Sequence, residues 1–155
     1  MVNSRDSILQ ALFNLLLTAN YPFTLNTPAC SRKMIHWDNV PSGSQPILLL
    51  QQGPQEANQP DPVIKLNRWI MHATAWVYFR NEQDKVTSTT ICQVQDAIDN
   101  VITPVPGKRQ SLGGLVTQTW IKSFGDQEGV LDQLGGQALV WCEIEILVSD
   151  RQGPV

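Results

Sequence analysis

The sequence predicts an α+β domain, a mainly antiparallel β-sheet with two α-helices packed on one face. Two segments, residues 4–19 and 88–102, have apolar side chains at helical spacing, and each precedes segments with strand periodicity. Residues 138–148 alternate between apolar and other side chains, as a half-buried antiparallel strand does. The order of helix, strands, helix and strands differs from the regular alternation of a doubly wound parallel sheet.

The first helix is expected over residues 4–19. Asn3 or Ser4 can cap its free N–H groups, and Pro22 follows its end. Its apolar side chains lie three and four residues apart and therefore share one side, which must pack on an apolar surface. They are Ile8, Leu9, Leu12, Phe13, Leu15, Leu16 and Ala19.

The second helix is expected over residues 88–102, with Thr87 or Ser88 as its cap. Pro104 and Pro106 end it, because proline cannot continue the hydrogen-bonding pattern of a helix. Its apolar stripe consists of Ile91, Val94, Ile98 and Val101.

Five segments are expected to be strands. Residues 63–81 form the longest, with a bend near residues 67–68, and alternate Met71, Ala73, Ala75, Val77 and Phe79 with a second face that also carries aromatic residues. The loops are expected at residues 38–46, 53–62 and 125–136. The segment 53–62 holds three prolines and no large apolar residue, so it is expected to be exposed and mobile. The expected strands are residues 30–37, 47–52, 63–81, 115–124 and 138–148.

Composition limits the classes of function. The 155 residues suit one domain, expected over residues 1–148 with a polar tail at 149–155. A net charge of −3 argues against nucleic-acid recognition, which usually needs a clustered basic face. Charged and polar residues interrupt the N-terminal apolar run, and no segment approaches the ~20 apolar residues of a membrane span, so a soluble intracellular protein is expected. The three cysteines are widely spaced and are expected to be reduced thiols.

The side chains able to take part in catalysis or metal binding match no recognisable catalytic or metal-binding motif. Leu-Gly-Gly occurs twice, in SLGGLV (111–116) and QLGGQALV (133–140), but each copy precedes a strand pattern, so no helix N-terminus is available to bind phosphate. The glycines are better explained by positive φ, a bulge or the close approach of another chain segment. His36 and His72 match no zinc motif, and no enzymatic activity, cofactor or metal is expected.

Two sets of acidic residues are candidates for acid–base chemistry or for binding a divalent cation. Asp96 and Asp99 are three residues apart and can serve acid–base chemistry, although a solvated helix face is the commoner role. Asp126, Glu128 and Asp132 lack the spacing of an EF-hand.

Six segments in a fixed order suggest a family. They are NSRDSILQALFNLL, SRKMIHWDNVP, QPILLLQQ, DAIDNVITP, QSLGGLV and LGGQALVWCEIEILV. Together they resemble the tail terminator, or tail completion, proteins of long-tailed bacteriophages and prophages. The resemblance spans nearly the whole chain and rests on packing motifs, and residues 53–62 and 149–155 lie outside it.

The resemblance implies a ring of six copies without catalysis. In that family the ring ends polymerisation of the tail tube and presents a surface to the head, so the implied partners are the chain itself, the tail tube protein and head or neck connector proteins. The implied location is the head–tail junction of the virion, after assembly in the bacterial cytoplasm. The residues carried over as interface candidates are Arg32, Lys33, Trp37, Gln110, Leu112, Gly113, Gly114, Gly135, Gly136 and Gln137.

Charge adds a hypothesis about how copies meet. The basic positions 32–33 and 108–109 and the acidic loop 126–132 can be complementary across a subunit boundary. Three alternatives to the terminator remain open: a head-closure or neck connector protein of the same virion, a small hydrolase using Asp96, Asp99 or the histidines, and a binding module that uses the tryptophans.

Overall fold

The computed structural model describes residues 4–36, 39–61, 66–80, 86–128 and 137–151. Along the chain the elements are α1 (Arg5–Leu17), the short 3-10 helices η1 (Thr27–Ala29) and η3 (Ser42–Ser44), β1 (Ile47–Asp61), β2 (Leu66–Arg80), α2 (Thr87–Ile102), β3 (Gln118–Glu128) and β4 (Gln137–Arg151). The four strands form one antiparallel sheet in the order β1-β2-β4-β3, so β1 and β3 are its edges.

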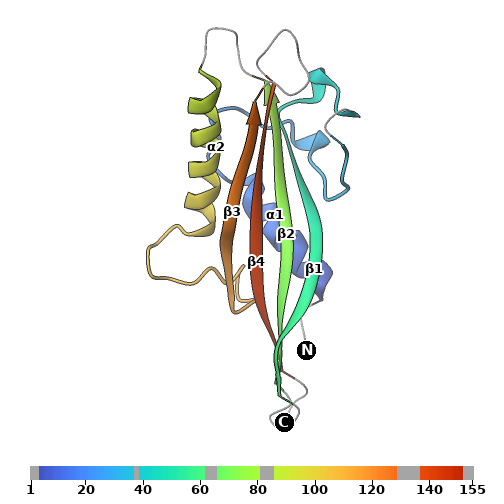
Figure 1. Cartoon of the computed structure of the whole chain (residues 1–155), viewed down its shortest axis with the longest axis vertical. Coiled ribbons are helices and arrows are strands. Elements are labelled where there is room, and N and C mark those ends of the chain that lie inside the picture. Colours follow the sequence, from blue (N-terminus) through green and yellow to red (C-terminus); the bar gives the residue numbers. More distant parts are fainter. Residues whose placement is uncertain (1–3, 37–38, 62–65, 81–85, 129–136, 152–155) are drawn as a thin grey trace.

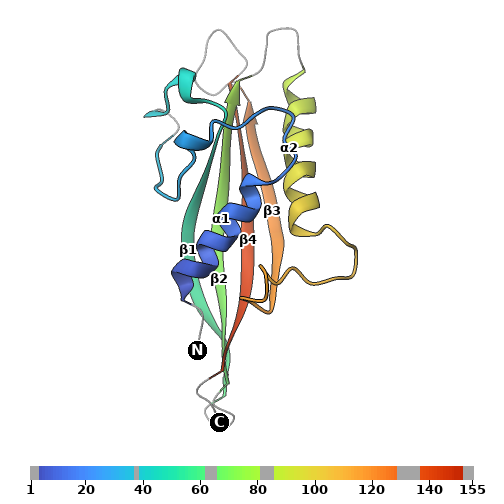
Figure 2. The same ribbon diagram turned by 180° about the vertical axis from the view of Figure 1, so that it is seen from behind.

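Both helices cover the same face of the sheet, which we call the inner face. Figure 1 shows α2 beside β3 with α1 behind the sheet, and Figure 2 shows α1 crossing the strands diagonally. The predicted α+β class is therefore confirmed. Within the described residues, neither helix is long and apolar enough to cross a bilayer.

The main core lies between the inner face and the two helices. The predicted apolar face of β2, Met71 to Phe79, is at most 1% exposed. The predicted apolar face of β4, Ala138 to Val148, is also buried, and both pack against α1 and α2. Burial of a large apolar side chain contributes about 1.5–3 kcal/mol, so this layer supplies most of the driving force for folding.

The helix α1 is formed much as expected. The Ser4 hydroxyl accepts a hydrogen bond from the backbone N–H of Ser7, which caps the first turn. The helix ends at Leu17, where the Thr18 hydroxyl donates to the Leu15 carbonyl. Five residues of the predicted stripe are buried: Ile8, Leu9, Leu12, Phe13 and Leu16.

The helix α2 differs from the prediction at its start. Val86 occupies the capping position and gives no side-chain hydrogen bond, whereas Thr87 and Ser88 lie inside the helix. The predicted stripe is correct, since Ile91, Val94 and Ile98 are buried and Val101 packs against them. Packing on the inner face therefore compensates for the absent side-chain cap.

The expected loop at residues 53–62 is wrong, because β1 continues to Asp61. Its pairing with β2 is irregular between Gln52 and Gln55 and again between Asn58 and Asp61, and each interval contains a proline, Pro54 or Pro60. Proline has no backbone N–H to donate to a neighbouring strand. An edge strand tolerates it at such bulges, because the hydrogen bond that proline would remove is not part of the pairing there. Backbone pairing with β2 thus overrides a composition that predicts a loop.

Several other predicted elements differ from the structure. In the segment expected as a strand at residues 30–37, the described residues 30–36 make only an isolated parallel bridge, between Ser31 and Leu49. The strand expected at 115–124 begins at Gln118 and runs to Glu128, into the predicted loop 125–136. Residues 129–136 lie outside the described part of the chain. The polar tail expected from residue 149 begins later, because β4 pairs with β2 as far as Arg151. The bend expected near residues 67–68 does not interrupt this pairing, since the β2–β4 register is continuous there.

A smaller second core covers the upper part of the opposite face, which we call the outer face. The segment after α1 folds over it, and Val40 and Ile35 pack there with Leu49, Tyr78 and Leu139. The Tyr78 hydroxyl donates to the Ile35 carbonyl, which fastens this segment to β2. Trp76 and Trp141 pack against this second core and belong to the candidate site described below.

The three cysteines are free thiols in different environments. Cys92 is exposed on α2, Cys30 is half-buried and Cys142 is buried. Burial raises the pKa of the Cys142 thiol to about 12, and the carboxylates of Asp99 and Glu143 add to the rise.

We predict that a thiol alkylating reagent at about pH 8 modifies Cys92 fastest in the native protein and leaves Cys142 intact. The thiolate is the reactive form, and both the burial and the raised pKa of Cys142 suppress it. Mass spectrometry of peptides after alkylation, with and without denaturant, measures the order. Rapid native labelling of Cys142 would contradict the packing of β4 against the helices.

Candidate interaction surface

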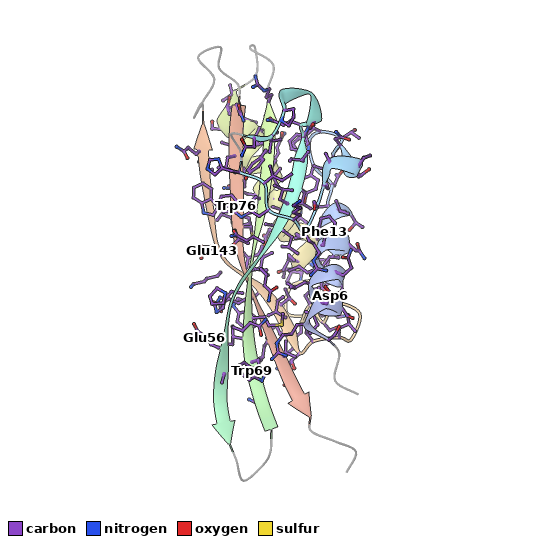
Figure 3. All side chains as sticks on the ribbon, turned by 90° about the vertical axis from the view of Figure 1, so that its right-hand side faces the viewer. Asp6, Phe13, Glu56, Trp69, Trp76 and Glu143 are labelled. Atoms are coloured by element: carbon purple, nitrogen blue, oxygen red, sulfur yellow. The ribbon has the colours of Figure 1, made fainter. Side chains whose placement is uncertain are left out.

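Two tryptophans lie side by side on the outer face. Trp76 of β2 is the register partner of Trp141 of β4, and their ring centroids are 5.7 Å apart with planes inclined at 36°. The Trp76 Nε1–H donates to the Gln51 Oε1 of β1 at 3.0 Å. Both rings are only partly buried, and Figure 3 shows Trp76 on the side of the sheet opposite Phe13 of α1. Aromatic side chains with one apolar side and one wet side are enriched at interfaces.

A glycine on β3 makes room for Trp141. Gly125 is the register partner of Trp141, and a Cβ at this position would lie 2.1 Å from the indole Cε2. The ring therefore rests directly on the β3 backbone. We call Leu49, Trp76, Trp141 and Gly125 the tryptophan row, because their register joins all four strands in a single line across the sheet.

Below the tryptophan row, charged side chains from all four strands meet on the outer face. The His72 ring on β2 lies 3.9 Å from a carboxylate oxygen of Glu56 and 3.9 Å from one of Glu145. The Lys122 ammonium on β3 lies 3.7 Å from Glu145, and the Ser123 hydroxyl donates to Glu143 at 3.2 Å. Figure 3 places Glu56 and Glu143 on this outer side. Lys122 and Glu145 form an ion pair, whereas the His72 contacts are ion pairs only when the imidazole is protonated, so the set is an open cluster of charged and polar side chains.

The candidate acid–base residues do not come together. Asp96 and Asp99 project from the exposed side of α2, which packs on the inner face, whereas His72 lies on the outer face. Within the described ranges, no group of three or more His, Cys, Asp or Glu side chains is placed to hold a metal ion. A hollow of about 460 Å³ is lined by the segment Leu17–Thr27, away from the tryptophan row and the candidate carboxylates.

The basic candidates lie in two places. Lys108 and Arg109 are exposed in the loop after α2, on the same side as the acidic candidates, whereas Arg32 and Lys33 lie beside β1. Arg32 donates to the Asp6 carboxylate at 3.0 Å and to Gln10 at 3.2 Å, so its charge is already paired with α1. Lys33 is exposed and makes no ion pair with another described residue. Of the two basic positions beside β1, Lys33 is therefore the one available to a partner.

The acidic candidates lie at the other side of the sheet. Asp126 of β3 is exposed and accepts a hydrogen bond from the Gln95 side chain of α2 at 3.4 Å. Asp96 and Asp99 are exposed on the same helix, which contains no lysine or arginine. Asp132 lies outside the described residues.

The first Leu-Gly-Gly segment is explained by backbone conformation. Leu112, Gly113 and Gly114 have φ values of 51°, 73° and 92°, a region that favours glycine. A Cβ on either glycine would meet nothing within 4 Å, so the expected close approach of another segment is not found within the described chain. Gln110 has a separate role, since its side-chain amide donates to the Val101 and Ile102 carbonyls and accepts from the Leu112 N–H.

The interface candidates from the resemblance do not form one surface. Arg32 and Lys33 lie beside β1, the segment Gln110–Gly114 follows the C-terminal end of α2, and Gln137 is buried at the start of β4, where it accepts from Arg80. Trp37, Gly135 and Gly136 lie outside the described residues. The tryptophan row was not predicted, because Trp76 and Trp141 fall in separate expected strands and Gly125 falls in the loop expected at residues 125–136.

We predict that Gly114→Val lowers the free energy of unfolding by about 1–3 kcal/mol, because a β-branched residue is strained at positive φ. Gly43→Val is the matched control, since Gly43 is exposed, lacks a positive φ and has open space at its Cβ position. Urea unfolding of both variants measures the difference. Equal stability of the two variants would contradict the backbone explanation.

We predict that Gly125→Ala lowers the free energy of unfolding by about 1–3 kcal/mol, because its Cβ displaces the Trp141 ring. In the double variant Gly125→Ala/Trp141→Leu the two effects should not add, since the clash is removed with the ring. A double-mutant cycle by urea unfolding, with tryptophan fluorescence as the signal, measures this coupling. Strict additivity would show that the ring does not rest on Gly125.

Comparison with known proteins names no relative. A scan against protein-family models and a search of curated proteins give no match to this chain. The function is therefore inferred from the contacts, burial and charges of the described residues together with the sequence resemblance.

Proposed function

We propose that this protein is a tail terminator, a structural protein that forms a ring on the end of a phage tail tube. The ring would end polymerisation of the tube and present a surface to the head or neck connector proteins. Self-association, the tube protein and the connectors are the partners of this proposal, and the virion's head–tail junction is its location.

The observation that carries the proposal is the outer face of the sheet. It presents partly exposed tryptophans above a cluster of charged and polar side chains contributed by all four strands. Interfaces that are partly aromatic and partly polar are typical of protein assemblies. A four-stranded surface that is only partly covered and carries such side chains suits contact with another protein.

The shape of the sheet also supports an assembly role. The strands β1, β2 and β4 continue beyond α1 at one end of the molecule, as Figure 1 shows. We call this extension the arm. Arg5 of α1 contacts two of its strands, because its side chain donates a hydrogen bond to Gln55 of β1 and lies 5.3 Å from the centroid of the Trp69 ring of β2. An arm that extends past the core can reach a neighbouring subunit.

The hydrolase alternative has less support from the geometry. Asp96 and Asp99 and the ring of His72 belong to opposite sides of the sheet, so they cannot act on one substrate atom. The connector alternative differs from the terminator in its partner, since a connector binds the portal or head side without controlling the length of the tube.

The test is native mass spectrometry over a range of concentrations, with and without millimolar magnesium, followed by tube assembly. We predict a species of six times the chain mass of 17.3 kDa. Because a terminator caps only tube ends, substoichiometric amounts should also arrest the growth of tubes formed by the tail tube protein of the same virus. The control is the same assay with an unrelated ring protein. Tubes that keep growing with the protein in stoichiometric excess would overturn the proposal.

A further inference from the structure

We propose that neighbouring copies join side by side, with the β1 side of one copy against the β3 and α2 side of the next, and that Lys33 faces Asp126 across this contact. This inference rests on the proposed ring and specifies which surfaces form it. Each of the two surfaces binds a neighbouring copy of this chain.

The first argument is the opposite charge of the two sides. Beside β1, Lys33 is exposed and makes no ion pair with another described residue, while Arg32 is held by Asp6. At the other side, near the level of the tryptophan row, Asp126 and the α2 residues Asp96 and Asp99 are exposed, and no cation of the described chain is paired with them. The exposed cations on this side lie lower, since Lys122 contacts Glu145, and Lys108 and Arg109 follow the C-terminal end of α2. Each side therefore fits the opposite side of another copy and repels a like side.

The second argument is that the two sides lie at the same level along the strands. Ser31, two residues before Lys33, bridges Leu49, which belongs to the tryptophan row. The row continues through Trp76 and Trp141 to Gly125, the residue before Asp126. The two charged positions thus lie near opposite ends of one line across the sheet.

This common level matters for closure. A contact between two different surfaces gives a closed ring when successive copies rotate without rising, and an open helix when they also shift along the axis. Partner surfaces at one level require no shift along the strands. The geometry is therefore that of a ring whose axis runs roughly parallel to the strands, with the tryptophan row as its circumference.

The third argument concerns the type of contact. Near the level of the row the β1 edge is already occupied by its own chain, because the Ser31 N–H donates to Leu48 and the Leu50 N–H donates to Ser31. A neighbour cannot add a strand there. The contact at this level is consequently made by side chains, with exposed Met34, next to Lys33, as its apolar element.

The experiment exchanges the two charges. Lys33→Asp places two acidic sides in contact, and Asp126→Lys places two basic sides in contact, so each variant alone should need on the order of tenfold higher concentration to assemble. An equimolar mixture should assemble like the wild type, because alternating copies restore an opposite pair at every contact. The double variant Lys33→Asp/Asp126→Lys should also assemble alone.

The control is Lys108→Asp, which makes the same charge change on the α2 side but below the level of the tryptophan row, because the nearby Gln110 bridges Thr119 of β3, six residues before Gly125. If the contact lies at the level of the row, this variant should leave assembly unchanged. The readouts are native mass against concentration at low and high salt, and circular dichroism to confirm that each variant is folded. Unchanged assembly of both single variants would overturn this interface while leaving the ring intact. Impaired single variants that neither the mixture nor the double variant restores would also overturn it. A wild-type protein that forms no ring, alone or on tubes, would instead count against the proposed function.

Discussion

The pairing of β2 with β4 is the constraint on which the other features depend. Each strand has 15 residues, and their antiparallel register runs from Leu66 opposite Arg151 to Arg80 opposite Gln137 without an irregularity. A slip of one residue would turn every side chain of one strand to the other face. The burial of Met71 to Phe79 beneath the helices and the meeting of Trp76 with Trp141 are therefore two results of one register.

The irregularities of the sheet are confined to its outer pairs. The β1–β2 register shifts near Pro54 and Pro60, and the β3–β4 register shifts between Ile121 and Ser123. At the first shift, the His72 Cβ lies 3.0 Å from the position that a Cβ on Gly53 would take, so glycine permits the strands to approach. The central pair thus stays regular while the edge strands bend to follow it, which keeps the outer face continuous.

The sequence predicts those parts of the fold that depend on local periodicity. The stripes of α1 and α2 and the apolar faces of β2 and β4 could be read directly, because burial on one face imposes a fixed spacing. The extension of β1 through residues 53–61 could not, since an edge strand is stabilised by its neighbour's backbone and tolerates prolines and polar residues. The tryptophan row was missed for a related reason, because aligning Trp76, Trp141 and Gly125 requires the register of three strands.

The two faces of the sheet differ in what they contribute: the inner face provides the core, and the outer face provides the exposed surface. The inner face is filled by helices, and its apolar contacts account for stability without presenting any recognition surface. The outer face is only partly covered, so its tryptophans both contribute cross-strand packing and remain available for contact. Since one row of paired residues runs from the bridge at Ser31 to Gly125, the same hydrogen bonds that hold the sheet together also fix the spacing between the segment of Lys33 and the strand end that carries Asp126. A change in register would thus alter both the core and the geometry of the proposed assembly.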